Sequence, residues 1–185
     1  MPLEIEIKLR VESLDSVRHT LTALKARRVG MVREQNIFFD RPDRSLLANH
    51  SGLRVRLSWA AGKKEPAALI TFKGPPQKEG LRSREAYDLH VSPQEQAIPM
   101  VEALGFERTL SFEKYRESWR MDGCLIELDE LPQLGMFLEI EGPSEVQVLA
   151  VREKLGLGEH PAVKESYIAM VDARLKGSGT RDLTF

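Results

Sequence analysis

Residues 4–11, Glu-Ile-Glu-Ile-Lys-Leu-Arg-Val, alternate strictly between charged and apolar side chains. This period of two is typical of a β-strand, because successive side chains of a strand point to opposite faces. One face of the predicted strand is apolar, and the other carries two carboxylates about 6.6–6.8 Å apart. Two carboxylates at that spacing could bind one divalent cation. The alternative is an amphipathic strand whose charged face is solvated.

Later segments repeat the pattern and favour the first interpretation. Residues 31–40, rich in β-forming residues, and residues 53–57, 68–73, 82–91, 106–121, 124–129 and 136–141 also read as strands, most with one apolar and one charged face. Solvated faces usually mix in Ser, Thr, Gln and Asn, whereas these faces consist mainly of Arg, Lys, Glu and Asp. The charged positions are Glu4, Glu6, Lys8, Arg54, Arg56, Lys73, Arg84, Lys114, Arg116, Glu127, Asp129, Glu139 and Glu141.

Amphipathic helices are predicted between and after these strands. Ser13 and Ser144 are suited to cap two of them, the segment 92–95 reads as a capping box for a helix ending at residue 104, and a last helix is expected over 163–175. Such helices would cover the apolar side of the sheet, so the charged face would turn inward if the sheet closes. We therefore expect an α+β fold, a closed eight-stranded antiparallel β-barrel with helices packed outside.

A barrel of about eight strands has an interior only just wide enough for its side chains or a small ligand. Charges inside it are tolerable if acids and bases compensate one another and a charged ligand completes the balance. Carboxylates would bind a divalent metal through oxygen. Arginine and lysine would bind phosphates, arginine in a bidentate manner. The pattern therefore predicts a site for a linear polyphosphate chelated to a metal.

Composition restricts the remaining possibilities. The chain has 185 residues, of which 42% are hydrophobic and 30% charged, as expected for one globular domain. We assign it to residues 1–176 and expect a flexible Gly/Ser-rich tail over 177–185. The net charge of −1 gives no argument for nucleic acid or anionic membrane as a partner. One cysteine excludes an internal disulfide framework. Without a signal or membrane-spanning pattern, a cytoplasmic location is expected.

The segments that contain these charged residues also resemble the sequence motifs of a known family. Residues 4–8 match the Glu-x-Glu-x-Lys signature of the CYTH superfamily, the triphosphate tunnel metalloenzymes. Four further segments fall in the order that this family shows: Leu53-Arg54-Val55-Arg56, Thr71-Phe72-Lys73-Gly74-Pro75, Lys114-Tyr115-Arg116 and Leu134 to Glu141. The resemblance extends from residue 3 to about residue 172. It implies an antiparallel tunnel of eight strands, triphosphate substrates, and Mg²⁺ or Mn²⁺ as the cofactor.

Roles carried over by position divide the charged residues into two groups. The resemblance implies metal ligands at Glu4, Glu6, Asp129, Glu139 and Glu141. It implies a triphosphate-binding and catalytic set at Lys8, Arg54, Arg56, Lys73 and Arg116, with further substrate contacts from Arg84, Lys114 and Lys164. One segment departs from the family pattern, because residues 82–85 read Arg-Ser-Arg-Glu where the family usually has Arg-x-Glu, so Glu85 has no assigned role.

The same set of acids and bases suits more than one reaction. The chain looks most like the class IV adenylate cyclase branch, which would convert ATP to cyclic AMP and pyrophosphate. Relatives in the family include inorganic tripolyphosphatases and thiamine triphosphatases, so a hydrolase is the alternative. A third possibility is a non-catalytic protein that binds polyphosphate or a nucleotide. The resemblance also suggests a homodimer.

Overall fold

The computed structural model describes residues 3–76 and 82–185, with the backbone alone for residues 3, 4, 82 and 83. In chain order the elements are β1 (Leu3–Val11), α1 (Leu14–Ala23), β2 (Arg27–Asp40), α2 (Ser45–Ala48), β3 (Gly52–Ala60), β4 (Ala67–Lys73), β5 (Arg82–Val91), the 3₁₀ helix η1 (Gln94–Gln96), α3 (Ala97–Ala103), β6 (Glu107–Met121), β7 (Cys124–Leu131), β8 (Gly135–Gly142), α4 (Glu145–Lys154), α5 (Tyr167–Leu175) and β9 (Asp182–Leu183).

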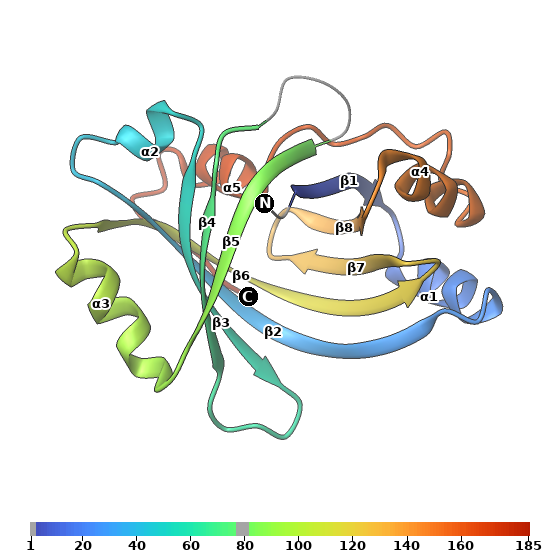
Figure 1. Cartoon of the computed structure of the whole chain (residues 1–185), viewed down its shortest axis with the longest axis horizontal. Helices are drawn as coiled ribbons and strands as arrows, with labels where there is room; N and C mark the ends of the chain where they lie inside the picture. Colours follow the sequence, from blue (N-terminus) through green and yellow to red (C-terminus); the bar gives the residue numbers. More distant parts are fainter. Residues whose placement is uncertain (1–2, 77–81) are drawn as a thin grey trace.

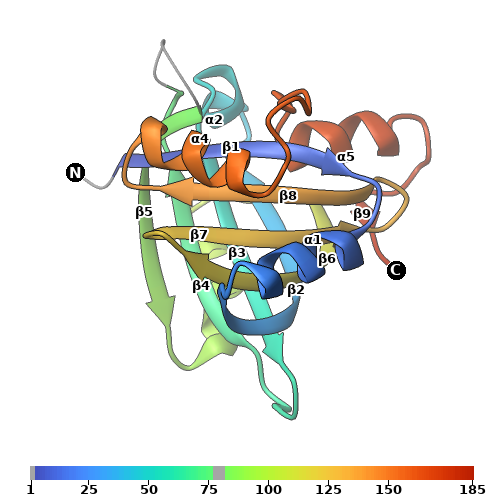
Figure 2. The ribbon, with the colours of Figure 1, turned by 90° about the vertical axis from the view of Figure 1, so that its right-hand side faces the viewer.

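The strands form one sheet in the order β2-β3-β4-β5-β1-β8-β7-β6-β9, and β2 also pairs with β6. Every pairing among β1 to β8 is antiparallel, and β9 alone runs parallel to its neighbour β6. Strands β2 and β6 are long and strongly curved, so the eight antiparallel strands curl into a half-barrel, with α1, α3 and α4 on its outer face (Figures 1 and 2). The mostly antiparallel α+β architecture that the sequence predicts is therefore present.

Helices bury the apolar outer face of the sheet in two clusters. On one side, α1 and α4 pack against β1, β7 and β8 through residues such as Leu21, Val148, Leu9 and Ile140. On the other side, α3 packs through Ala97 and Val101 against the outer face of β2, β3 and β4. Where these helices cover the sheet, the strands can turn polar side chains to the inner face without exposing apolar ones to water.

At one end, the inner face itself becomes apolar. Phe112 and Phe137 lie on the same faces of β6 and β8 as Lys114 and Glu139, two residues away along each strand. They form a third cluster with Leu110, Leu131, and the residues Tyr167 and Val171 of α5. The segment before α5 is fixed to β1, because Val163 N–H donates to the Lys8 carbonyl at 2.8 Å. Helix α5 thus lies beside the C-terminal end of β1 (Figure 2).

Two predicted helices begin later than expected. Residues 94–96 form a 3₁₀ turn without a side-chain cap, and the α-helix begins only at Ala97. Pro99 explains the difference, because its ring would clash with the carbonyl of residue 95 if both lay in one α-helix. The last helix begins at Tyr167 after the cap residue Ser166. The caps predicted at Ser13 and Ser144 are confirmed, since each side chain accepts a hydrogen bond from the first turn.

The C-terminal segment is packed, which differs from the flexible tail expected from its composition. Leu183 pairs with Phe112 on β6 and is 1% exposed. Ser111 N–H donates to the Arg181 carbonyl at 2.8 Å, and Asp182 forms an ion pair with Arg108. The buried leucine and these polar contacts offset the conformational entropy lost by a short segment whose Gly and Ser residues suggest mobility.

Leu183→Ala should therefore destabilise the protein measurably. Truncation of a buried leucine leaves a cavity and typically costs about 2–5 kcal/mol. Urea unfolding gives the free energy of unfolding, and Thr184→Ala is the matched control because Thr184 is exposed. The control should change stability by less than about 0.5 kcal/mol. Equal stability of the two variants would contradict the packed tail.

Candidate functional site

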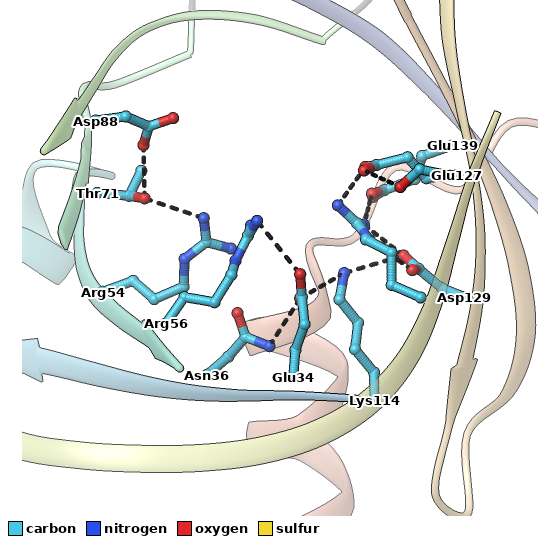
Figure 3. A network of polar contacts seen from close by, with 12 residues as sticks. Glu34, Asn36, Arg54, Arg56, Thr71, Asp88, Lys114, Glu127, Asp129 and Glu139 are labelled. Carbon is cyan, nitrogen blue, oxygen red and sulfur yellow. Dashed lines mark hydrogen bonds and ion pairs between the residues drawn. The ribbon is translucent and has the colours of Figure 1, made fainter. Parts of the chain in front are cut away.

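Charged side chains from seven strands meet on the inner face of the half-barrel. We call them, with two neutral partners, the inner-face network, and its members are Lys8, Glu34, Asn36, Arg54, Arg56, Thr71, Asp88, Lys114, Arg116, Glu127, Asp129 and Glu139. Figure 3 shows most of these side chains facing one another from opposite walls. The alternation along each strand is what directs them to the same side.

Arg116 and Asp129 form the centre of the network. Arg116 on β6 donates from Nε and Nη2 to the two carboxylate oxygens of Asp129, at 2.7 and 2.5 Å. The same guanidinium donates to Glu139 at 2.6 Å and forms an ion pair with Glu127. Burial alone would lower the pKa of Arg116, but Asp129 and Glu127 outweigh it and raise the pKa well above its usual value. This arginine is therefore a permanent charge that neutralises a group of carboxylates.

Lys114 and Glu34 connect this centre to the opposite wall. Lys114 Nζ donates to Asp129 at 3.1 Å and lies 3.6 Å from Glu34, which in turn lies 3.4 Å from Arg56. Burial, together with neighbouring Arg116, lowers the pKa of Lys114. Burial would raise the pKa of Glu34, but the charges of Lys114 and Arg56 lower it far below its usual range. Glu34 is thus an ionised carboxylate placed among cations.

The wall formed by β3, β4 and β5 contains cations with unused donors. Arg54 donates to Thr71 at 3.1 Å, and Thr71 donates to Asp88 at 2.7 Å. Burial and the nearby charge of Arg56 lower the pKa of Arg54 to about 9. Within the described residues, the Nε atoms of Arg54 and Arg56 and Oδ1 of Asn36 are buried without a hydrogen-bond partner. A bound anion would satisfy the two arginine donors.

Lys8 belongs to the wall formed by β1 and β8. Its Nζ lies 3.4 Å from Glu139, donates to the Glu165 carbonyl at 3.3 Å, and lies 3.6 Å from the centre of the Tyr167 ring. Burial would raise the pKa of Glu139, yet the charges of Lys8 and Arg116 lower it far below its usual range. At pH 7 this wall therefore holds charged groups of both signs in direct contact.

The structure brings together many of the residues that the sequence singled out, though not all of them. Lys8, Arg54, Arg56, Lys114, Arg116, Asp129 and Glu139 belong to the inner-face network. Glu6 and Glu141 lie directly opposite each other on β1 and β8 and are half-buried. Lys73 and Arg84 lie half-buried on β4 and β5. Lys164 is exposed and precedes α5 by three residues, so it does not lie on the helix as predicted. The side chain of Glu4 lies outside the described part of the structure.

The predicted metal ligands do not form one compact group. Asp129 and Glu139 are engaged with Arg116, and among the described residues no three acidic, His or Cys side chains converge as a metal site. The chemistry of the remaining donors nevertheless fits Mg²⁺ or Mn²⁺. Magnesium is commonly bound through one or two carboxylates plus water and substrate phosphates. The facing pair Glu6 and Glu141 provides such carboxylates beside the basic residues.

Four residues of the site were missed by sequence reasoning. Glu34 and Asn36 lie in a strand recognised by its β-forming residues, and only their spacing of two could have marked a shared face. Asp88 lies on a strand with poor alternation. Tyr167 lies four residues before Val171 on the apolar stripe of α5 and reads as a core residue. Its hydroxyl donates a hydrogen bond to Asp129 at 2.9 Å, and no pattern in the local sequence predicts this contact.

Comparison with known proteins identifies the family. A model of the CYTH domain matches residues 2–167, which is most of the chain, and the chain therefore belongs to the CYTH family. A Methanocaldococcus jannaschii protein, provisionally named an adenylate cyclase, is 22% identical over 177 residues, covering 91% of this chain and 98% of the relative.

Solved structures have the same fold. A Vibrio parahaemolyticus protein, also provisionally named an adenylate cyclase, superposes with a TM-score of 0.77 at 23% identity over 89% of this chain and 95% of the other. A Hippeastrum protein, provisionally named an adenylyl cyclase and described as revealing a dominant triphosphatase activity, gives a TM-score of 0.67 at 21% identity over 96% of each chain.

Glu34→Gln should make the protein less stable at neutral pH and less sensitive to acid. At about pH 7, loss of this buried charge leaves Arg56 and Lys114 less compensated, at a cost of about 1–3 kcal/mol. The folded-state pKa of Glu34 lies below its ordinary value of 4.5, so the stabilisation is present above that pH and is lost as the pH falls below it.

Thermal unfolding between about pH 7 and pH 3 tests this expectation. The difference between wild type and Glu34→Gln should shrink as the solution becomes acidic. Exposed Glu102 on α3 provides the control Glu102→Gln, which should match the wild type throughout. A difference for Glu34→Gln that stays constant with pH would contradict the ionised, ion-paired state of this carboxylate.

Proposed function

We propose that the sheet encloses a tunnel and that the protein is a divalent-metal-dependent enzyme acting on triphosphate-containing substrates there. Two facts support the tunnel. Each strand from β1 to β8 pairs with a neighbour on both sides, because β2 pairs with β6 as well as with β3. The concave face also carries the buried charges, which an open solvated sheet would not need to compensate so extensively.

One observation carries the proposal, the buried cations with unsatisfied donors. Arg54 and Arg56 are held in place by neighbouring strands, yet each keeps a buried Nε without a partner in the described structure. Guanidinium groups bind phosphate oxygens through two parallel hydrogen bonds. Lys8 and Lys114 add charge from the facing wall. A linear triphosphate lying between the walls would supply the missing acceptors.

Mg²⁺ or Mn²⁺ would bind at Glu6 and Glu141, with Glu4 as a further candidate ligand. Glu139 and Asp129 both contact Arg116, so a metal would compete with that guanidinium for either carboxylate. When bound, such an ion supplies positive charge that polarises the phosphoryl group. The protein's own residues bind and orient the phosphates and stabilise the charge that develops on them. Lys73, Arg84 and Lys164 are proposed as additional phosphate contacts. Phosphoryl transfer depends mainly on positioning and electrostatics of this kind.

Adenylate cyclisation is the leading reaction, supported by the names of the relatives in M. jannaschii and V. parahaemolyticus. In this reaction the ribose 3′-oxygen of ATP attacks the α-phosphorus and loses its proton. The bond to the bridging oxygen breaks, and cyclic AMP and pyrophosphate are released. Arg54 and Arg56 would bind the departing pyrophosphate, whose negative charge increases as the bond breaks.

Hydrolysis of a triphosphate is the second candidate, favoured by the triphosphatase activity described for the Hippeastrum protein. Water would then attack a terminal phosphorus, as in hydrolysis of tripolyphosphate or thiamine triphosphate. The same basic residues serve both reactions, because both leave negative charge on a phosphate chain.

Within the described residues no helix is long and apolar enough to cross a membrane. A cytoplasmic location and a homodimer stay part of this proposal.

Product analysis should distinguish the two reactions. The purified protein is incubated with Mg²⁺ or Mn²⁺ and, separately, ATP, tripolyphosphate and thiamine triphosphate. A cyclase should give cyclic AMP and pyrophosphate from ATP, and a triphosphatase should release orthophosphate.

Glu141→Gln should lower turnover at least about 100-fold because a metal ligand is lost. Glu130→Gln, at an exposed position near the C-terminal end of β7, should have wild-type activity. Full activity of Glu141→Gln in the presence of a chelator would overturn metal dependence.

Thermal stabilisation by tripolyphosphate should test the phosphate site without catalysis. A ligand at about 100 times its Kd stabilises the folded state by about 2.7 kcal/mol, which for a chain of this size raises the Tm by roughly 5–10 °C. Arg54→Ala and Arg56→Lys should reduce the shift, the latter because an ammonium cannot form the bidentate contact. Higher salt should reduce it through screening.

Arg33→Ala is the matched control, since Arg33 is exposed on β2 and stacks on Trp59. It should keep the full shift. If Arg54→Ala and Arg33→Ala behave alike, the inner arginines do not bind the phosphates.

A further inference from the structure

Two lysines from opposite parts of the sheet contact one aromatic ring. The Nζ atoms of Lys8 on β1 and Lys114 on β6 lie 3.6 and 5.0 Å from the centre of the Tyr167 ring. Both lysines are 2% exposed, so their charges are almost entirely removed from water. A cation over an aromatic face is attracted by the ring quadrupole, and the attraction is strongest where water is excluded.

The tyrosine is itself held rigidly. Its hydroxyl donates to Asp129 at 2.9 Å, and the rings of Phe112 and Phe137 pack edgewise against it at 6.2 and 5.3 Å. Ser166 caps the helix that Tyr167 begins, by accepting a hydrogen bond from Ala169 N–H. The ring therefore has a fixed position at the boundary between the apolar end of the inner face and the charged network.

An aromatic ring supports a lysine differently from a carboxylate. Glu139 and Asp129 attract Lys8 and Lys114 but also cancel their charges, which weakens the attraction for an anion. The ring is neutral, so it offsets part of the desolvation penalty while the full positive charge stays available to a ligand. The ring can therefore hold the Lys8 and Lys114 ammonium groups close together, although the two like charges repel each other.

We propose that Tyr167 is a positioning residue of the triphosphate site, and that its ring holds the Lys8 and Lys114 ammonium groups where they bind the phosphates. This inference rests on the proposed function and assigns a role to a residue outside the family motifs recognised in the sequence. The aromatic ring carries the role, and the hydroxyl serves to orient it through Asp129. Loss of the ring should therefore weaken phosphate binding far more than loss of the hydroxyl.

The experiment measures tripolyphosphate binding to the full-length protein by calorimetry without added metal. Tyr167→Phe keeps the ring and should bind within about threefold of the wild type, whereas Tyr167→Leu should bind about tenfold more weakly. Phe39→Leu is the control for lost aromatic packing, because Phe39 is also buried but packs in the outer cluster under α3. It should bind like the wild type. Tyr167→Met has nearly the same volume as the leucine variant but a flexible, unbranched side chain that can adapt to the site, and it replaces the leucine variant if that variant fails to fold.

A double-mutant cycle separates positioning from a general structural effect. In a Lys8→Met background, the same Tyr167→Leu change should weaken binding by less than about threefold, because one of the two cations that the ring holds is gone. Equal binding by Tyr167→Leu and wild type, or an undiminished effect in the Lys8→Met background, would overturn the inference and leave the proposed function standing. Absence of tripolyphosphate binding by the wild type would instead overturn the proposed function, and the inference with it.

Discussion

The ion pair between Arg116 and Asp129 is the interaction on which the charged interior depends. A buried, fully desolvated carboxylate is tolerated only when its oxygens are paired, and Asp129 is contacted by Arg116, Lys114 and the Tyr167 hydroxyl. Arg116 in turn neutralises Glu127 and Glu139. Without this centre, the neighbouring carboxylates of β7 and β8 would be buried on one face without compensating charge. The arrangement fixes one wall of the site before any ligand is present.

The opposite wall is less completely compensated, which is the asymmetry on which the proposed anion site rests. Arg56 forms an ion pair with Glu34, and Arg54 donates to the neutral Thr71, which in turn donates to Asp88. Their buried Nε atoms lack partners in the described residues, and the pKa of Arg54 is lowered to about 9. An anion placed between the walls would stabilise these cations. The fold therefore combines a preorganised acidic and basic wall with a basic wall that a ligand would complete.

The interior can be polar because the helices bury the other side of the sheet. Helices α1, α3 and α4 cover the apolar outer faces, so the strands gain their hydrophobic stabilisation outside the half-barrel. At the end near α5 the inner face is apolar as well, and Phe112, Phe137 and Leu183 pack there with Tyr167. At this apolar end α5 and β9 pack against the sheet, and Tyr167 of α5 contacts Lys8 and Lys114.

The sequence by itself determined the strands and the direction of their side chains. Strict alternation at Lys8, at Arg54 and Arg56, and at Lys114 and Arg116 assigned these residues to one face, because side-chain direction in a strand is a local property. Tertiary structure decided the partners. The register of β2 against β6 places Lys114 beside Glu34, and the register of β1 against β8 places Glu6 opposite Glu141. Packing of α5 against the sheet brings Tyr167 to Lys8, although the two residues are 159 positions apart in the chain. Such contacts depend on strand pairing and helix packing between distant segments, which no local pattern encodes.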